Sequence, residues 1–526
     1  MKRFRFFILF FTIAFIGVSA QEKPAKNVIL MIPDGTSLPV LSAARWYQRY
    51  KQPDVKRLHL DPYLCGTILT HSSNAPIGDS APTASCYVTG EVSRSGWIST
   101  YPTADLANDI MPINPDWAYQ PLMTFFEAAR ITQGKSVGLV FTCEFPHATP
   151  AACMSHSSNR SKYEWIAPQM AHNGIDVLIG GGNNYLDNSM KTYLESEGYG
   201  IFQNQPDTIG KYAGNKMWAL FGQTAMAYNI DRNSKTEPSL AEMVDIALHK
   251  LEKNEAGFVL MIEGSKIDWA AHANDPAAMI TEMLAFDEAC GVVFEYAERN
   301  SETLVVVAPD HGNSGFSIGS ARCGDYNSLS KDDLFYNISQ YKSSIGALVD
   351  QLKNMELSQI PSIIFEKTGL TLSQEELEGL QKGINEKTVT KLLNNHTCFG
   401  FTTGGHTGEE VFLAVYSPNG KEFTGHHSNI ELNQYICRSL DLEPLDQLTQ
   451  EYFAKHNEVF SGYDYSIENK EDTPVLVIKN KKNRLEIRPN TNIVLFNGKE
   501  KKLDSVVVYR DENKTFYLPK SLRSIL

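Results

Sequence analysis

Short apolar runs that lead straight into polar residues recur along this 526-residue chain. Three of them cover residues 27–32, 258–262 and 304–308, and amphipathic segments of helix length cover residues 240–253 and 277–299. Continuous apolar strands that alternate with helices are typical of a parallel sheet buried on both faces. We therefore predict an α/β fold with a central, mostly parallel sheet that is flanked by helices on both faces.

Acidic residues and a histidine follow these apolar runs directly. Asp34 comes after the first run, Glu263 follows the second, and Asp310 and His311 follow the third. Ligands collect at the carboxyl ends of parallel strands, so we expect these side chains to share one edge of the sheet. Imidazole with carboxylate favours zinc, and oxygen-only sets favour magnesium. Taken singly, Asp34 could belong to a turn and Glu263 could cap a helix, but the recurrence favours a metal site.

Two further segments offer ligands of the same kind. Asp268 and His272 are four residues apart, so on a helix both would project from one face and could bind one ion. His406 follows Gly404 and Gly405 in a glycine-lined loop, and glycines let the backbone approach a ligand closely. We predict that all three side chains join the metal site.

Ser80 is a candidate nucleophile. The sequence around it predicts a helix that begins near Ser80 with Pro82 in its first turn, where free N–H groups attract anions. A serine that merely caps the helix is the alternative. No histidine lies near Ser80 in the sequence, so activation would have to come from a metal ion that coordinates its oxygen.

Changes in sequence character divide the chain. Residues 21–465 carry the strands and the candidate site, and within them residues 312–405 look helical, which predicts an inserted cap. Residues 466–526 contain short β-type runs with a tight turn at Asn497-Gly498, and they carry 13 basic and 8 acidic residues. We predict a small C-terminal β module there.

The first twenty residues predict export. Lys2, Arg3 and Arg5 precede an apolar run that ends in Val18-Ser19-Ala20, as in a cleaved secretory signal. An uncleaved signal anchor is the alternative. No later run has the length of a membrane span, so we predict a periplasmic or secreted mature protein from Gln21 onwards with no membrane span.

Charge and cysteine content exclude other classes. The net charge of −13 argues against a protein that binds duplex nucleic acid through its phosphates. The eight cysteines show no zinc-ribbon spacing, and export would permit disulfides whose pairing the sequence does not reveal. Cys86 and Cys143 lie in apolar surroundings and could equally be buried thiols.

Taken together, these motifs resemble those of the alkaline phosphatase family over roughly residues 27–445. They occur in the family's order: Pro33-Asp34-Gly35, Asp79-Ser80-Ala81, His147-Ala148-Thr149, Arg160, Glu263 with Asp268 and His272, Pro309-Asp310-His311-Gly312, and His406-Thr407-Gly408. The resemblance implies hydrolysis of small phosphomonoesters through a phosphoserine, with two zinc ions and one magnesium ion. It also allows a homodimer.

The resemblance assigns a role to each residue. Ser80 resembles the nucleophile, and Arg160 resembles the guanidinium that grips the phosphate. The metal sets are Asp268, His272 and His406 for the first zinc, Asp34, Asp310 and His311 for the second, and Asp34, Thr149 and Glu263 for magnesium. His147 and Trp269 stand at positions that vary within the family, near the third site and the phosphate. A histidine there could admit zinc or cobalt in place of magnesium.

Other functions compete with this one. A phosphodiesterase or nucleotide pyrophosphatase of the same superfamily would share the zinc sites, but Thr149, Arg160 and Glu263 favour the monoesterase. A sulfatase would need arginine where Ala84 stands. A catalytically idle phosphate- or metal-binding protein is the alternative outside the enzymes, and the complete set of ligands argues against it.

Overall fold

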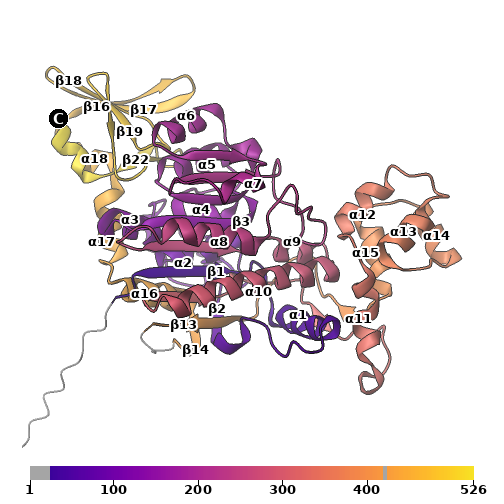
Figure 1. The fold of residues 1–526 in the computed structure, drawn as a ribbon. Helices are drawn as coiled ribbons and strands as arrows, with labels where there is room; N and C mark the ends of the chain where they lie inside the picture. Colours follow the sequence, from indigo (N-terminus) through magenta and orange to yellow (C-terminus); the bar gives the residue numbers. More distant parts are fainter. Residues whose placement is uncertain (1–23, 419–422) are drawn as a thin grey trace, which may run out of the picture.

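A ten-stranded sheet forms the centre of the computed structural model, which describes residues 24–418 and 423–526 (Figure 1). The predicted signal, residues 1–20, lies outside the described residues. Only β13 pairs antiparallel with its neighbours, so the sheet is mostly parallel, as predicted. From edge to edge the strands are β14 (Gly425–Ser428), β2 (Leu64–Leu69), β13 (Val411–Tyr416), β8 (Thr303–Val307), β1 (Asn27–Ile32), β7 (Phe258–Glu263), β3 (Ser136–Glu144), β4 (Val177–Gly181), β6 (Met217–Phe221) and β5 (Gly200–Gln203).

Helices cover both faces, which explains why the central strands are apolar throughout. In β1, Ile29 and Met31 pack into the core on one face, and Val28 and Leu30 pack into the core on the other. The first face is covered by α1 (Leu38–Lys51), α8 (Leu240–Leu251), α9 (Lys266–His272) and α10 (Pro276–Arg299). The second is covered by α2 (Ser80–Thr89), α3 (Phe125–Gln133), α4 (Ala148–Met154), α5 (Tyr163–His172), α6 (Asn188–Ser196) and α16 (Asn429–Leu440). The short helix α7 (Pro206–Ile209) lies between β5 and β6 in the chain.

Five helices between β8 and β13 stand to one side of the sheet (Figure 1). They are α11 (Lys331–Gln340), α12 (Ile345–Leu352), α13 (Ile360–Thr368), α14 (Gln374–Gln381) and α15 (Glu386–Asn395). Helix α12 begins at Ile345 because Ser344 caps it by accepting a hydrogen bond from the N–H of Ala347.

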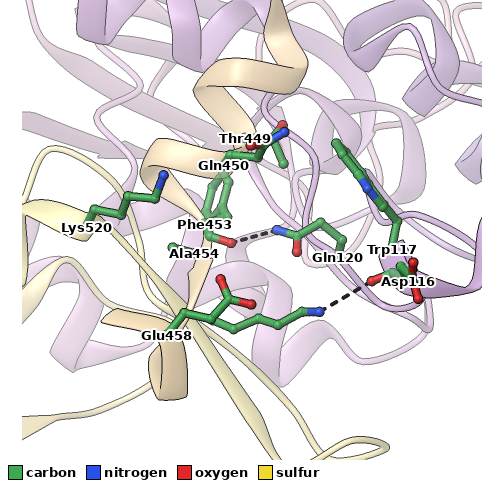
Figure 2. Close-up of a pocket in the computed structure, with 10 residues that line it drawn as sticks. Asp116, Trp117, Gln120, Thr449, Gln450, Phe453, Ala454, Glu458 and Lys520 are labelled. Atoms are coloured by element: carbon green, nitrogen blue, oxygen red, sulfur yellow. Dashed lines mark hydrogen bonds between the residues drawn. The ribbon is translucent and has the colours of Figure 1, made fainter. Parts of the chain in front are cut away.

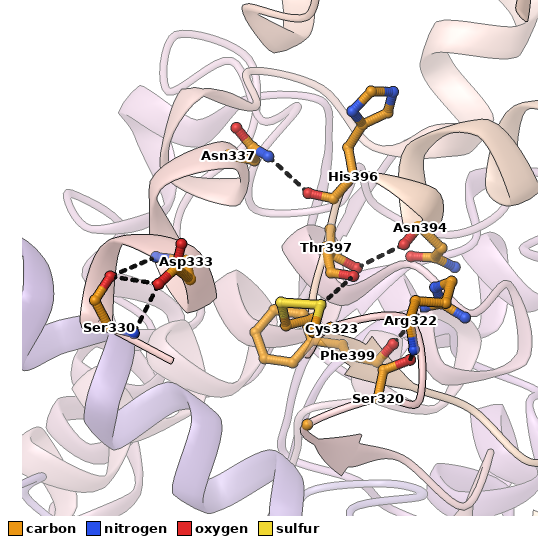
Figure 3. Close-up of a disulfide and its surroundings, with 12 residues drawn as sticks. Ser320, Arg322, Cys323, Ser330, Asp333, Asn337, Asn394, His396, Thr397 and Phe399 are labelled. Carbon is orange, nitrogen blue, oxygen red and sulfur yellow. Dashed lines mark hydrogen bonds between the residues drawn. A yellow bond between two sulfur atoms is a disulfide. The ribbon is translucent and has the colours of Figure 1, made fainter. Parts of the chain in front are cut away.

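A disulfide joins the two ends of this inserted segment. Cys323 and Cys398 are bonded, with a sequence separation of 75 residues (Figure 3). Near them the strands β10 (Ser317–Ile318) and β11 (Phe399–Gly400) pair, so both ends are also held by a short ladder. Cys86 and Cys143 are buried free thiols.

The C-terminal part contains two small antiparallel sheets. One holds β16 (Asp464–Lys470), β17 (Thr473–Asn480), β18 (Asn483–Ile487), β19 (Ile493–Phe496) and β20 (Lys499–Lys502), and the other holds β15 (Ala454–Lys455), β22 (Thr515–Leu518) and β21 (Val508–Arg510). Asn497 and Gly498, both with positive φ, form the predicted turn between β19 and β20. Helix α17 (Leu445–Tyr452) precedes β15, and helix α18 (His456–Val459) lies between β15 and β16 in the chain.

Contacts tie this part to the rest of the chain. Gln120 Nε2 donates to the carbonyl oxygen of Phe453 at 2.7 Å, and Lys455 Nζ donates to that of Asp116 at 3.3 Å (Figure 2). A cavity of about 300 Å³ lies between these segments. Among the described residues, none of the helices combines the length and the apolar character needed to cross a membrane.

Candidate active site

Three adjacent strands bring their following polar residues to one edge of the sheet. Asp34 follows β1, Glu263 ends β7, and Asp310 and His311 follow β8; all four side chains are buried. The backbone N–H of Gly35 donates to Asp310 Oδ1 at 3.1 Å, which fixes the β1 and β8 ends to each other. The structure thus brings together the residues that the sequence pattern grouped.

Asp268, His272 and His406 lie beside this group. Asp268 and His272 are on α9, with His272 Nε2 3.4 Å from Asp268 Oδ2. His406 is on β12 (His406–Thr407), which pairs with β9 (Gly312–Asn313), and its Nε2 lies 3.1 Å from His272 Nε2. Asp268 packs directly against the backbone of Gly35, and a side chain at residue 35 would collide with Asp268 Oδ1.

The three histidines are oriented by main-chain carbonyls. A carbonyl oxygen only accepts, so each Nδ1 carries a proton, and in the neutral imidazole the Nε2 lone pair is then the one that can bind an ion. Its hydrogen bond with Asp268 raises the pKa of His272 to about 9, so an ion bound there would replace the proton on Nε2. The Nδ1-to-oxygen distances are 2.8 Å from His272 to Gly404, 2.8 Å from His406 to Gly78 and 3.1 Å from His311 to Gly312.

Ser80 is the first residue of α2, and its Oγ lies 3.1 Å from His311 Nε2. The same nitrogen lies 3.4 Å from Asp34 Oδ1 and 3.5 Å from Asp310 Oδ2. Sequence reasoning found no histidine near Ser80 because 231 residues separate the two. The serine hydroxyl therefore sits at the boundary of the carboxylate and imidazole group.

Arg160 is held beside the serine by two neighbours. One of its Nη atoms forms an ion pair with Asp79, and the other lies 3.1 Å from His147 Nε2. Burial and then the charge of Arg160 lower the pKa of His147 to about 3, so this imidazole is neutral and accepts from the guanidinium. The Trp269 ring lies edge-on to the His147 ring, with 5.8 Å between centroids.

The buried carboxylates repel one another and lack donors. Burial, and then the charges of Asp310, Asp268 and Glu263, raise the pKa of Asp34 well above its usual range. Burial raises the pKa of Glu263 to about 8. Several buried oxygens have no hydrogen-bond partner: both oxygens of Asp34, Asp310 Oδ2, Glu263 Oε1 and Thr149 Oγ1. Divalent cations would supply the missing partner and charge, so the residues fit metal ions.

Ligand atoms in three groups lie within 4.8 Å of one another: Asp34, Asp310 and His311; Asp268, His311 and His406; and Cys143, His147 and Glu263. His272 borders the second group. Sequence reasoning missed Cys143 as a donor near the third site, where its Sγ lies 3.4 Å from Glu263 Oε2. Cys143 comes two residues after the apolar run 137–141, near the end of β3, and this position at a strand end was the available signal.

Comparisons with known proteins point to one family. A family model described as alkaline phosphatase matches residues 25–442. The chain is 31% identical to alkaline phosphatase 3 of Bacillus subtilis, over 80% of this chain and 92% of that protein. It is 28% identical to the repressible alkaline phosphatase of Saccharomyces cerevisiae, over 84% of this chain and 85% of that protein.

Solved structures agree as well. The cold-active alkaline phosphatase of a psychrophilic Shewanella species is similar with a TM-score of 0.69 and 28% identity, over 79% of this chain and 99% of that one. The Thermus thermophilus alkaline phosphatase is similar with a TM-score of 0.70 and 25% identity, over 80% of this chain and 92% of that one. The chain belongs to the alkaline phosphatase family of phosphomonoester hydrolases, which confirms the predicted family and fold.

Proposed function

We propose that this chain is an exported alkaline phosphatase that hydrolyses phosphomonoesters through a phosphoserine at Ser80. The observation that carries the proposal is the contact between Ser80 Oγ and His311 Nε2, made within a group of buried carboxylates that lack hydrogen-bond partners. A hydroxyl placed there can serve as a nucleophile once cations neutralise the group.

Three cation sites follow from the donors. Asp268, His272 and His406 would hold the first zinc, and Asp34, Asp310 and His311 the second. Asp34, Thr149 and Glu263 would hold a magnesium-type ion, with Cys143 and His147 as softer donors that could admit zinc or cobalt. When bound, such ions withdraw charge from phosphate oxygens and lower the pKa of the serine hydroxyl and of an attacking water.

The chain's own residues carry out two displacements. Ser80 Oγ gives up its proton to solvent and forms a bond to phosphorus while the bond from phosphorus to the alcohol oxygen breaks, and the leaving alcohol oxygen takes up a proton from solvent, so that no net proton is lost. A water molecule then attacks the phosphoserine, the bond from phosphorus to Oγ breaks, and inorganic phosphate leaves. Throughout, the Arg160 guanidinium donates to two non-bridging oxygens, and Asp79 and His147 orient it.

Export to the periplasm or outside the cell fits two observations. The N-terminal sequence has the pattern of a secretory signal, and the Cys323–Cys398 disulfide requires oxidising conditions to persist. We propose residues 1–20 as the signal, residues 21–465 as the catalytic unit with its cap at 312–405, and residues 466–526 as a small C-terminal β module.

Trapping the intermediate tests the nucleophile. Protein mixed with labelled phosphomonoester and quenched in acid should carry phosphate on Ser80, as located by peptide mass spectrometry. Ser80→Ala should abolish labelling and turnover, whereas Ser95→Ala, at an exposed serine, should retain both. Label on any other residue would overturn the assignment.

Metal analysis tests the cations. We expect about three divalent ions per chain and loss of turnover after chelation. Asp310→Asn should lower the bound metal, whereas Asp325→Asn, at an exposed carboxylate in the cap, should not. Full turnover by protein verified to be metal-free would contradict the proposal.

A further inference from the structure

A cavity of about 420 Å³ lies between His272 and the inserted helix α15. Its walls include His272, Arg322, Lys387, Lys391 and Phe401. Two hydrogen bonds hold α15 against the segment that follows α9: Thr390 Oγ1 donates to the carbonyl oxygen of Ala273 at 3.3 Å, and Asn394 Nδ2 donates to that of Asn274 at 2.9 Å. The cavity is therefore a fixed space beside a candidate metal ligand.

The walls of this cavity are basic in an acidic protein. The cavity walls contain three cationic side chains, Arg322, Lys387 and Lys391, and one carboxylate, Glu386. The whole chain, in contrast, carries a net charge of −13. Arg322 is anchored, because its Nη2 donates to the carbonyl oxygen of Phe399 at 2.7 Å, next to the disulfide (Figure 3). Both lysines are exposed on α15, so their ammonium groups are free to meet an anion.

A series of contacts leads from Ser80 to this cavity. In an in-line displacement the leaving oxygen lies opposite the attacking one. Ser80 contacts His311, whose ring stacks on His406 at 3.7 Å between centroids, and His272 lies beyond His406. A substrate with its phosphorus at Ser80 and its alcohol part directed along these three rings would extend towards the basic walls.

We propose that this cavity is a subsite for a second phosphate on the alcohol part of the substrate, so that bisphosphorylated alcohols are preferred over monophosphorylated ones. The proposal rests on the proposed function, because it uses the phosphomonoesterase site to place the first phosphate. Arg322, Lys387 and Lys391 would together donate to the second phosphate and offset its charge.

Matched substrates test the subsite. In the native protein, kcat/KM should be higher for α,ω-alkanediol bisphosphates of three to six carbons than for the corresponding monophosphates, by more than the twofold that two equivalent phosphates provide. The double variant Lys387→Gln/Lys391→Gln should lose about tenfold on the best bisphosphate and less than twofold on its monophosphate. Added salt should reduce the preference.

Lys382→Gln is the matched control, because Lys382 is exposed on the same inserted segment and lies outside the cavity walls. It should leave both substrates unchanged. No preference in the native protein, or equal losses on both substrates in the double variant, would overturn the subsite. Absence of monophosphate hydrolysis in the native, metal-loaded protein would overturn the proposed function instead.

Discussion

At Arg160, two neighbours decide where the guanidinium points. Asp79 forms an ion pair with one Nη atom, and His147 Nε2 lies near the other. Burial raises the pKa of Asp79, but the charge of Arg160 outweighs this effect, and the pKa is lowered. The ion pair therefore persists at any pH where the enzyme is folded and Asp79 is ionised. A group fixed in this way is ready to bind phosphate without further ordering.

We predict that Arg160→Ala reduces kcat/KM more for a monoester than for a matched diester. A monoester offers three non-bridging oxygens, so two can meet the guanidinium while another faces the cations; a diester has one fewer. The extra loss should be about 2 kcal/mol, or roughly thirtyfold. Arg94→Ala, which breaks a part-exposed pair with Asp105, is the control. Equal losses on both substrates would instead favour a phosphodiesterase.

A buried carboxyl away from the site gives a pH prediction. Burial raises the pKa of Glu282, on α10, to about 7. A carboxyl whose pKa is raised on folding favours the native state at low pH, and this contribution is lost as the pH rises from about 4.5 to 7. Glu282→Gln removes this pH-dependent loss of stability and keeps an oxygen that accepts from the N–H of Asn229.

The variant should therefore become more stable relative to the native protein as the pH rises from 5 to 8, by at most about 3 kcal/mol. Thermal unfolding midpoints of both proteins across this range measure the difference. Glu288→Gln, at an exposed carboxyl on the same helix, should show no such trend. A difference in midpoint that stays constant with pH would contradict the prediction.

At the level of elements, the sequence predicted the strand ends well. An apolar run is a local signal, and parallel neighbours end at the same edge of a sheet. The sites of Asp34, Glu263 and Asp310 follow from where β1, β7 and β8 stop. The contact between Ser80 and His311 could not be predicted, because it depends on how α2 packs against the end of β8. Cys323 and Cys398 were equally out of reach, since nothing local marks two cysteines 75 residues apart as partners.

We predict that the disulfide stabilises the inserted helices. Closing a loop of this length restricts the unfolded chain by about 4 kcal/mol on the loop-entropy estimate. Reduction, or the double substitution Cys323→Ser/Cys398→Ser, should destabilise the inserted segment. We expect this as faster hydrogen exchange in α11–α15. Exchange in α2 and β1 should change little. Cys437→Ser, at a free cysteine, is the control, and unchanged exchange after reduction would count against the prediction.

At the level of the whole molecule, the C-terminal strands share a core with the catalytic unit. Val508 and Tyr517 pack in one apolar cluster with Met123, Ala128 and Phe453. The change in sequence pattern and charge near residue 466 suggested a small C-terminal β module, yet a deletion there would expose this cluster. Single substitutions at the junction therefore test its role more cleanly than truncation does.

Arg510, on β21, is the buried polar anchor of that junction. Its guanidinium donates to Thr100 Oγ1 and to the carbonyl oxygens of Tyr119 and His156, and burial lowers its pKa to about 10. His156 comes four residues before Arg160, so the anchor lies close in the chain to the proposed phosphate ligand.

Arg510→Met keeps the apolar stem but removes the donor to Thr100 Oγ1 and to the carbonyl oxygens of Tyr119 and His156, of which His156 keeps a second donor in Gln169 Nε2. The loss should cost about 2–4 kcal/mol of stability. Chemical denaturation measures that loss. If the C-terminal part acts only as a brace, kcat/KM for a small monoester at 25 °C should stay within twofold of the native value. Arg523→Met removes donors to Val459 and Ser461 within the C-terminal part and controls for the loss of an arginine. A well-folded Arg510→Met protein with full metal content but little turnover would show that the junction positions Arg160, since no proposed ligand lies beyond His406.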